Sequence, residues 1–161
     1  MAKLRDVVAY LVKNYPHESE LSKARLTKMV YLADWRSAIL RGKQITNINW
    51  EFNYYGPYVE DVVNVARNDP AFSVERRVNV YGEPKEVIKV SSDIKHESLT
   101  DEEKEILDFV IKSTAPKYWD EFIKLVYSTY PIVTQPRFSK LNLVELARRY
   151  KKEEQELLKG D

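Results

Sequence analysis

The sequence has 161 residues, of which 43% are hydrophobic and 32% are charged, and its formal net charge is +1. This composition fits one domain of ordinary size and excludes a disordered or membrane-spanning chain. The sequence has no cysteine, which excludes disulfides and thiolate metal sites, and its near neutrality argues against a dedicated nucleic-acid binder. We therefore expect a single domain over residues 1–161 and, because no signal-peptide pattern is present, a cytoplasmic location.

Helical periodicity dominates the first quarter of the chain. Apolar residues recur every three to four positions over residues 3–15, and Pro16 ends this predicted helix. A longer helix is predicted over residues 22–41, with Gly42 where a C-terminal glycine belongs. Because this second helix is apolar on two faces, we expect it to be the central helix of the domain.

The stretch over residues 47–63, NINWEFNYYGPYVEDVV, changes period in its middle. Polar and apolar residues alternate up to a Tyr-Tyr-Gly-Pro-Tyr cluster, which predicts a strand that Gly56 and Pro57 end. A short helix is then predicted up to the breaker at residues 68–70. The strand face that we expect to be buried carries Ile48, Trp50, Phe52 and Tyr54.

A hairpin and a capped helix follow in the prediction. Residues 71–90 contain two strand-like runs around Gly-Glu-Pro, which is a turn signal. Thr100 and Glu103 form a capping-box pattern before an apolar run of helical spacing. This part of the chain therefore adds two antiparallel strands and one helix.

Two more helices complete the predicted fold. The first covers residues 118–127 and is followed by Pro131; the second covers residues 143–158. Residues 148–161 are mostly charged, and we expect this end of the last helix to be solvated or frayed. The side chains expected to point inward from the first of these helices are Trp119, Phe122, Ile123 and Val126. The elements together predict an α+β fold, mainly helical, with about six helices and a small antiparallel β-sheet.

Residue patterns typical of a catalytic or metal site are missing from the sequence. Neither His17 nor His96 has a second histidine three or four positions away, so a helical metal site is not expected. Nucleophile-elbow, P-loop and dinucleotide-binding patterns are absent. The acidic groups at residues 60–61, 101–103 and 120–121 lie where helices begin, positions that favour acids because of the helix dipole. We therefore predict a protein that is not an enzyme and has no cofactor and no metal.

A group of basic residues leaves nucleic-acid binding open as an alternative. Lysines and arginines gather in and just after the second predicted helix, where a phosphate-contacting stripe is one interpretation. Acidic residues close in sequence dilute this positive charge. The basic residues are Arg25, Lys28, Arg36, Arg41 and Lys43.

The stretch LSKARLTKMVYLADWRSAILRGKQIT, followed shortly by NWEFNYYGPYVEDV, resembles the Panacea domain, also called the SocA-like antitoxin domain. That family is recognised by a helix of the type Leu-x-Lys-Leu-x-Tyr-x-Ala, a glycine, a strand that ends in Tyr-Gly-Pro, and a later Thr-x-Pro region. The chain departs from the family pattern at Tyr58-Val59, where valine followed by a small residue or proline is frequent. The residues that match the motifs are Leu26, Lys28, Met29, Tyr31, Leu32, Ala33, Asp34, Gly42, Tyr55, Gly56, Pro57, Thr129 and Pro131.

The resemblance implies an antitoxin of a toxin–antitoxin pair, which neutralises a cognate protein toxin by direct contact. Some family members deliver their toxin to a cytoplasmic protease, so a protease adaptor is a second hypothesis, with the charged residues 148–161 as its second contact surface. The alternative function is a nucleic-acid-binding regulator of a mobile element or phage. Aromatic and basic side chains anchor many protein interfaces. The residues predicted to contact the partner are Lys28, Arg36, Tyr55 and Tyr58.

Overall fold

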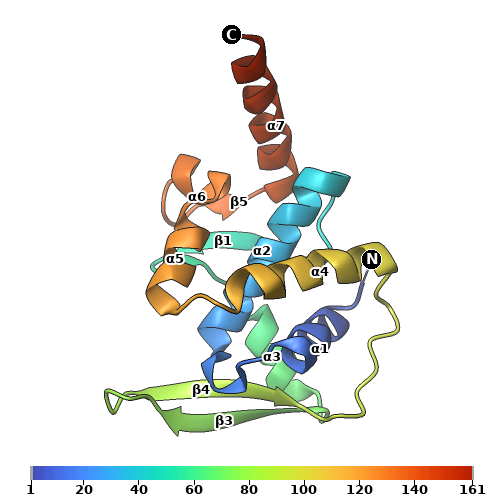
Figure 1. The fold of residues 1–161 in the computed structure, drawn as a ribbon, viewed down its shortest axis with the longest axis vertical. Helices are drawn as coiled ribbons and strands as arrows, with labels where there is room; N and C mark the ends of the chain where they lie inside the picture. The colour runs from blue at the N-terminus through green and yellow to red at the C-terminus, as the bar shows by residue number, and fades with distance from the viewer. Residues whose placement is uncertain (1, 161) are drawn as a thin grey trace.

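The computed structural model describes residues 2–160 and contains seven α-helices, a short 3₁₀ helix and two small antiparallel sheets (Figure 1). The predicted fold class, α+β and mainly helical, is confirmed. The helices are α1 (Leu4–Asn14), η1 (Glu18–Glu20), α2 (Lys23–Arg41), α3 (Asp61–Asn68), α4 (Asp101–Thr114), α5 (Trp119–Tyr127), α6 (Tyr130–Thr134) and α7 (Leu143–Lys159). The strands are β1 (Trp50–Asn53), β2 (Gly56–Pro57), β3 (Phe72–Val78), β4 (Pro84–Val90) and β5 (Lys140–Leu141).

Helix α2 runs through the middle of the molecule and packs against α1, α3, α4 and α7 (Figure 1). Its ends follow the sequence signals: the Ser22 hydroxyl accepts a hydrogen bond from the Arg25 backbone N–H, and Gly42 adopts a left-handed conformation with φ of 71°. Most of its side chains are buried, on every face, because other elements surround it. The prediction of a central helix is confirmed.

The two sheets lie in different parts of the fold. Strands β3 and β4 form a hairpin, as predicted, at the end of the molecule opposite the projecting end of α7 (Figure 1). Strand β1 is the middle strand of the other sheet, in the order β2-β1-β5. The pairing of β1 with β5 brings residues 50–51 against residues 140–141, a contact that local sequence patterns do not reveal.

The chain reverses at Tyr54 and Tyr55, so the prediction that Gly56 and Pro57 simply end the strand was wrong. Gly56 and Pro57 instead form β2 and pair back onto Asn53 and Phe52. Gly56 has a φ of +100°, which lets the chain return at once without steric strain. As a consequence Tyr54 is a turn residue with 69% of its surface exposed, not a core residue as predicted.

Two predictions near α5 also needed correction. Trp119 is 45% exposed because it is the first residue of α5, ahead of the buried Phe122, and its ring is tilted against the Phe122 ring with the ring centres 5.8 Å apart. Pro131 does not merely follow α5: it lies in the first turn of an additional helix, α6, where its missing N–H is not needed. This helix raises the number of α-helices from the predicted six to seven.

Helix α7 projects away from the body of the molecule (Figure 1). Leu143, Leu146 and Ala147 anchor its first turns in the core, and residues 151–160 are exposed on all sides. None of the helices that the structure describes is long and apolar enough to cross a membrane.

Candidate functional site

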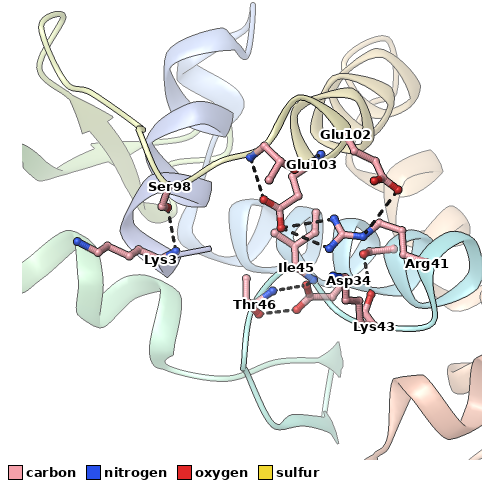
Figure 2. Close-up of polar contacts among 11 residues, drawn as sticks. Lys3, Asp34, Arg41, Lys43, Ile45, Thr46, Ser98, Glu102 and Glu103 are labelled. Carbon is pink, nitrogen blue, oxygen red and sulfur yellow. Dashed lines mark hydrogen bonds and ion pairs between the residues drawn. The ribbon is translucent and has the colours of Figure 1, made fainter. Parts of the chain in front are cut away.

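The most connected polar group in the protein is the Asp34 carboxylate. Its Oδ1 accepts hydrogen bonds from the backbone N–H groups of Ile45 and Thr46, both at 2.9 Å (Figure 2). Its Oδ2 accepts from the Thr46 hydroxyl at 2.6 Å, the Trp50 indole at 2.9 Å and the Gln44 amide at 3.3 Å. Burial raises the pKa of Asp34 to about 6, while the hydrogen bonds from Thr46, Trp50 and Ile45 act in the opposite direction. Both oxygens are occupied, so Asp34 holds the loop between α2 and β1 rather than facing a ligand.

Basic side chains of α2 are largely engaged inside the protein. The Arg25 guanidinium donates to the backbone carbonyls of Thr114 and Lys117, both at 2.8 Å, and lies over the Phe122 ring at 4.4 Å. Arg41 approaches the Glu103 carboxylate to 3.4 Å and joins the ends of α2 and α4 (Figure 2). These contacts remove two members of the basic group from any phosphate-contacting stripe.

Lys28 is the third internal basic residue, and its surroundings differ. Only 1% of its surface is exposed, and its Nζ has no hydrogen-bond or ion-pair partner among residues 2–160. The ammonium lies 5.8 Å from the centre of the Tyr58 ring, and its Cε lies beside Gly56, close to the Tyr127 ring. Because no acid compensates its burial, the pKa of Lys28 falls to about 8. Asp34, six positions further along α2, makes its contacts elsewhere and does not pair with Lys28.

Three exposed aromatic residues lie in the β1–β2 turn and in the loop before β5; we call Tyr54, Tyr55 and Phe138 the aromatic patch. Tyr54 and Phe138 pack edge to face with their ring centres 4.8 Å apart. Tyr55 is 82% exposed and Phe138 63%. Phe138 is the only described non-glycine residue with positive φ, at 69°, and its N–H donates to the Phe52 carbonyl. A bulky residue in this conformation is strained, so the surrounding structure holds Phe138 outward against a local preference.

A second surface feature is an apolar groove of about 300 Å³ between α2, α4 and the α5–α6 corner. The Arg36 guanidinium crosses it and stacks over the Phe109 ring at 3.4 Å from the ring centre. Leu40 and Phe109 remain 58% and 46% exposed at its edge. The groove is lined by Leu32, Trp35, Arg36, Ile39, Leu40, Phe109, Val110, Ser113, Thr114, Leu125 and Thr129.

The four residues predicted to contact a partner do not form one cluster. Tyr58 is half-buried and its ring lies next to the Lys28 ammonium. Tyr55 is exposed in the adjacent turn, and Arg36 lines the groove. Sequence reasoning missed Tyr54 and Phe138 as surface residues, and also Phe109. No local signal marks Phe138, because its exposure depends on the pairing of β5 with β1.

The motif residues of the resemblance are mostly structural in this fold. Tyr31 and Thr129 share a buried hydrogen bond of 2.8 Å, and Pro57 is buried opposite Phe52. Pro131 opens α6. The others are Leu26 and Ala33 in the core, Gly42 as the end of α2, and Gly56 in the turn.

Fold and surface together define a small α+β domain with an exposed aromatic patch and an apolar groove. Among residues 2–160 no group of three acidic or histidine side chains converges on a metal position. The family model described as antitoxin SocA-like, Panacea domain, matches residues 26–131, and the chain belongs to this family. Membership supports an antitoxin role. No curated protein and no solved structure matches the sequence.

Proposed function

We propose that this protein is the antitoxin of a toxin–antitoxin pair and that it neutralises a cognate protein toxin by covering the toxin with its aromatic patch. The family membership carries this proposal, since it points to a protein toxin as the partner. The aromatic patch supports it, because large exposed aromatic side chains supply most of the binding energy in many interfaces.

The patch suits a binding role because the turn that carries Tyr54 and Tyr55 is held in place. Tyr54 rests against Phe138, and the β1–β2 turn is fixed by the pairing of Phe52 with Pro57. Aromatic side chains lose little conformational entropy on binding when they are held in this way. The inhibition is steric, so it requires no cofactor and no metal.

The other predicted contact residues have different parts in this proposal. Tyr55 belongs to the patch itself, and Tyr58 lies next to it in the chain. Lys28 supports Tyr58 from beneath and meets a partner only if the turn moves. Arg36 lies in the groove and is considered below.

The test is a co-expression assay with the small proteins encoded next to this chain. A neighbour that stops growth alone, and is harmless and co-purifies with this chain, is the toxin. We expect the variant Tyr54→Ser/Tyr55→Ser/Phe138→Ser to lose both rescue and co-purification.

A matched control is available in the same protein. Tyr81, in the β3–β4 turn, is 86% exposed, and Tyr118, before α5, is 75% exposed. The variant Tyr81→Ser/Tyr118→Ser removes two strongly exposed aromatic rings elsewhere and should retain rescue. Equal rescue by both variants would refute the patch as the toxin contact. If none of the neighbouring proteins is toxic and neutralised by this chain, the antitoxin proposal itself is refuted.

A protease-adaptor role is the second candidate, and the projecting part of α7 is the observation that favours it. Leu157 and Leu158 are each 75% exposed on this otherwise charged segment. If α7 delivers the toxin to a cytoplasmic protease, removing residues 151–161 should lengthen the lifetime of the bound toxin without weakening its binding. Loss of toxin binding in this deletion would argue against a separate delivery surface.

A further inference from the structure

The apolar groove has the shape of a seat for a helix. One wall is a continuous stripe of α2, whose members at positions 32, 35, 36, 39 and 40 have the spacing of one helix face over two turns. The facing wall is formed by α4 at positions 109, 110, 113 and 114. Two helical walls with an apolar floor between them are the arrangement that receives an amphipathic helix in many complexes.

The polar groups of the groove leave one charged group available. Thr114 donates its hydroxyl to the Val110 carbonyl at 2.7 Å, and Thr129 donates to the Val126 carbonyl at 2.6 Å. The hydroxyl protons of both threonines are therefore engaged within the protein. The remaining charged lining residue is Arg36, and no acidic residue lines the groove in the part of the chain that the structure describes.

Arg36 is free to bind a carboxylate. Within residues 2–160 its guanidinium has no ion-pair or hydrogen-bond partner, in contrast to Arg25 and Arg41. Stacking on Phe109 covers one face of the planar guanidinium, and the N–H groups, which lie in the guanidinium plane, remain unbonded. Such a fixed fork matches the two oxygens of a carboxylate.

We propose that this groove is a second docking surface, and that its occupant is an amphipathic helix of a partner protein whose apolar stripe fills the groove and whose Asp or Glu binds Arg36. The positive charge of Arg36 favours an acidic side chain on the partner helix. The length of the α2 stripe matches a partner segment of about two helical turns. None of Tyr54, Tyr55 and Phe138 lines the groove, so the inference does not depend on the toxin contact proposed above.

The test uses two fluorescein-labelled, hydrocarbon-stapled helical peptides with the same leucine stripe. One carries glutamates beside the stripe, and the other carries lysines at the same positions. Fluorescence anisotropy with the full chain should show at least about tenfold tighter binding of the acidic peptide, which corresponds to one charge-assisted contact. Arg36→Glu should reverse the preference, and Leu40→Asn should weaken both peptides.

Arg76 provides the matched control. It is exposed on β3, away from the groove, and Arg76→Glu makes the same change in net charge. This variant should leave the preference for the acidic peptide unchanged, and thermal melts should show that Arg36→Glu remains folded.

Three results would overturn the proposal. They are equal binding of the two peptides, no binding of either, and a preference that Arg36→Glu and Arg76→Glu alter alike. A fourth is a dimer seen by sedimentation that Leu40→Asn dissociates and that excludes the peptides, since the occupant would then be a second copy of this chain.

Discussion

Tyr31 and Thr129 are 98 positions apart in the sequence and share a fully buried hydrogen bond of 2.8 Å. The Thr129 hydroxyl proton already goes to the Val126 carbonyl, at 2.6 Å, so the Tyr31 hydroxyl is the donor in this pair. The bond ties the centre of α2 to the corner between α5 and α6, which forms one end of the apolar groove.

Removing the two partners of this bond should have unequal effects. Tyr31→Phe removes a donor and leaves Thr129 bonded to Val126, so we expect a loss of about 1 kcal/mol in the free energy of unfolding. Thr129→Val leaves the buried Tyr31 hydroxyl without an acceptor, and we expect a loss of about 2 kcal/mol. Urea unfolding of both single variants and of the double variant measures the coupling. If the loss of unfolding free energy in the double variant equalled the sum of the two single losses, the direct bond would be contradicted.

Asp34→Asn should destabilise the protein by about 3 kcal/mol although it preserves size. An asparagine keeps one acceptor oxygen, while its NH₂ group would face donors such as the Trp50 indole and the Thr46 N–H or hydroxyl. Asp93→Asn, at an exposed position, is the matched control and should change stability by less than about 0.5 kcal/mol. Similar losses for the two variants, measured by urea unfolding, would show that the Asp34 contacts contribute little.

Lys28 should make the free energy of unfolding vary with pH in the alkaline range. The folded-state pKa of Lys28 is lowered to about 8, against 10.5 for an ordinary lysine, because burial disfavours its charge. Between these values the unfolded chain binds more protons than the folded one, so stability should rise with pH across this window. The full rise attributable to Lys28 is roughly 3 kcal/mol.

The measurement is the difference in unfolding free energy between the natural protein and Lys28→Met at pH 7.5 and at pH 10. We expect Lys28→Met to be the more stable protein at the lower pH and the advantage to shrink at the higher pH. Lys152→Met, at an exposed position of α7, should show no such change. A constant difference between Lys28→Met and the natural protein would mean that Lys28 is solvated in the folded state.

Phe138→Gly should affect stability and binding in opposite directions. Glycine adopts the observed φ of 69° without strain, so we expect the free energy of unfolding to rise by about 0.5–1 kcal/mol. The same change removes an exposed ring from the aromatic patch, so affinity for the toxin should fall. Calorimetric melting and a titration with the purified toxin test the two effects. A loss of stability would show that the Tyr54–Phe138 contact outweighs the strain.

Local patterns in the sequence predicted most of the helices. Residues 22–41, with Ser22 before them and Gly42 after them, contain their own start and stop signals, and Thr100 with Glu103 closes the predicted capping box. These signals act through bonds between residues a few positions apart, so they can be identified without knowledge of the fold.

The candidate surfaces depend on contacts between distant parts of the chain. The alternation in β1 placed Tyr54 in the core, but the reversal onto Gly56 and Pro57 put it on the surface. Phe138 joins it only because β5 pairs with β1.

Burial of the basic residues has the same origin. Arg25 donates to the carbonyls of Thr114 and Lys117 at the end of α4. Lys28 is enclosed beside Gly56 and Tyr127, and Arg36 is left without an acid between α2 and α4. In the sequence these three cations look alike, since each lies on the same predicted helix. The sequence by itself determined where α2 begins and ends and the family to which the chain belongs. Only the tertiary structure decided which of its charges are satisfied, because their partners come from segments far away in the chain.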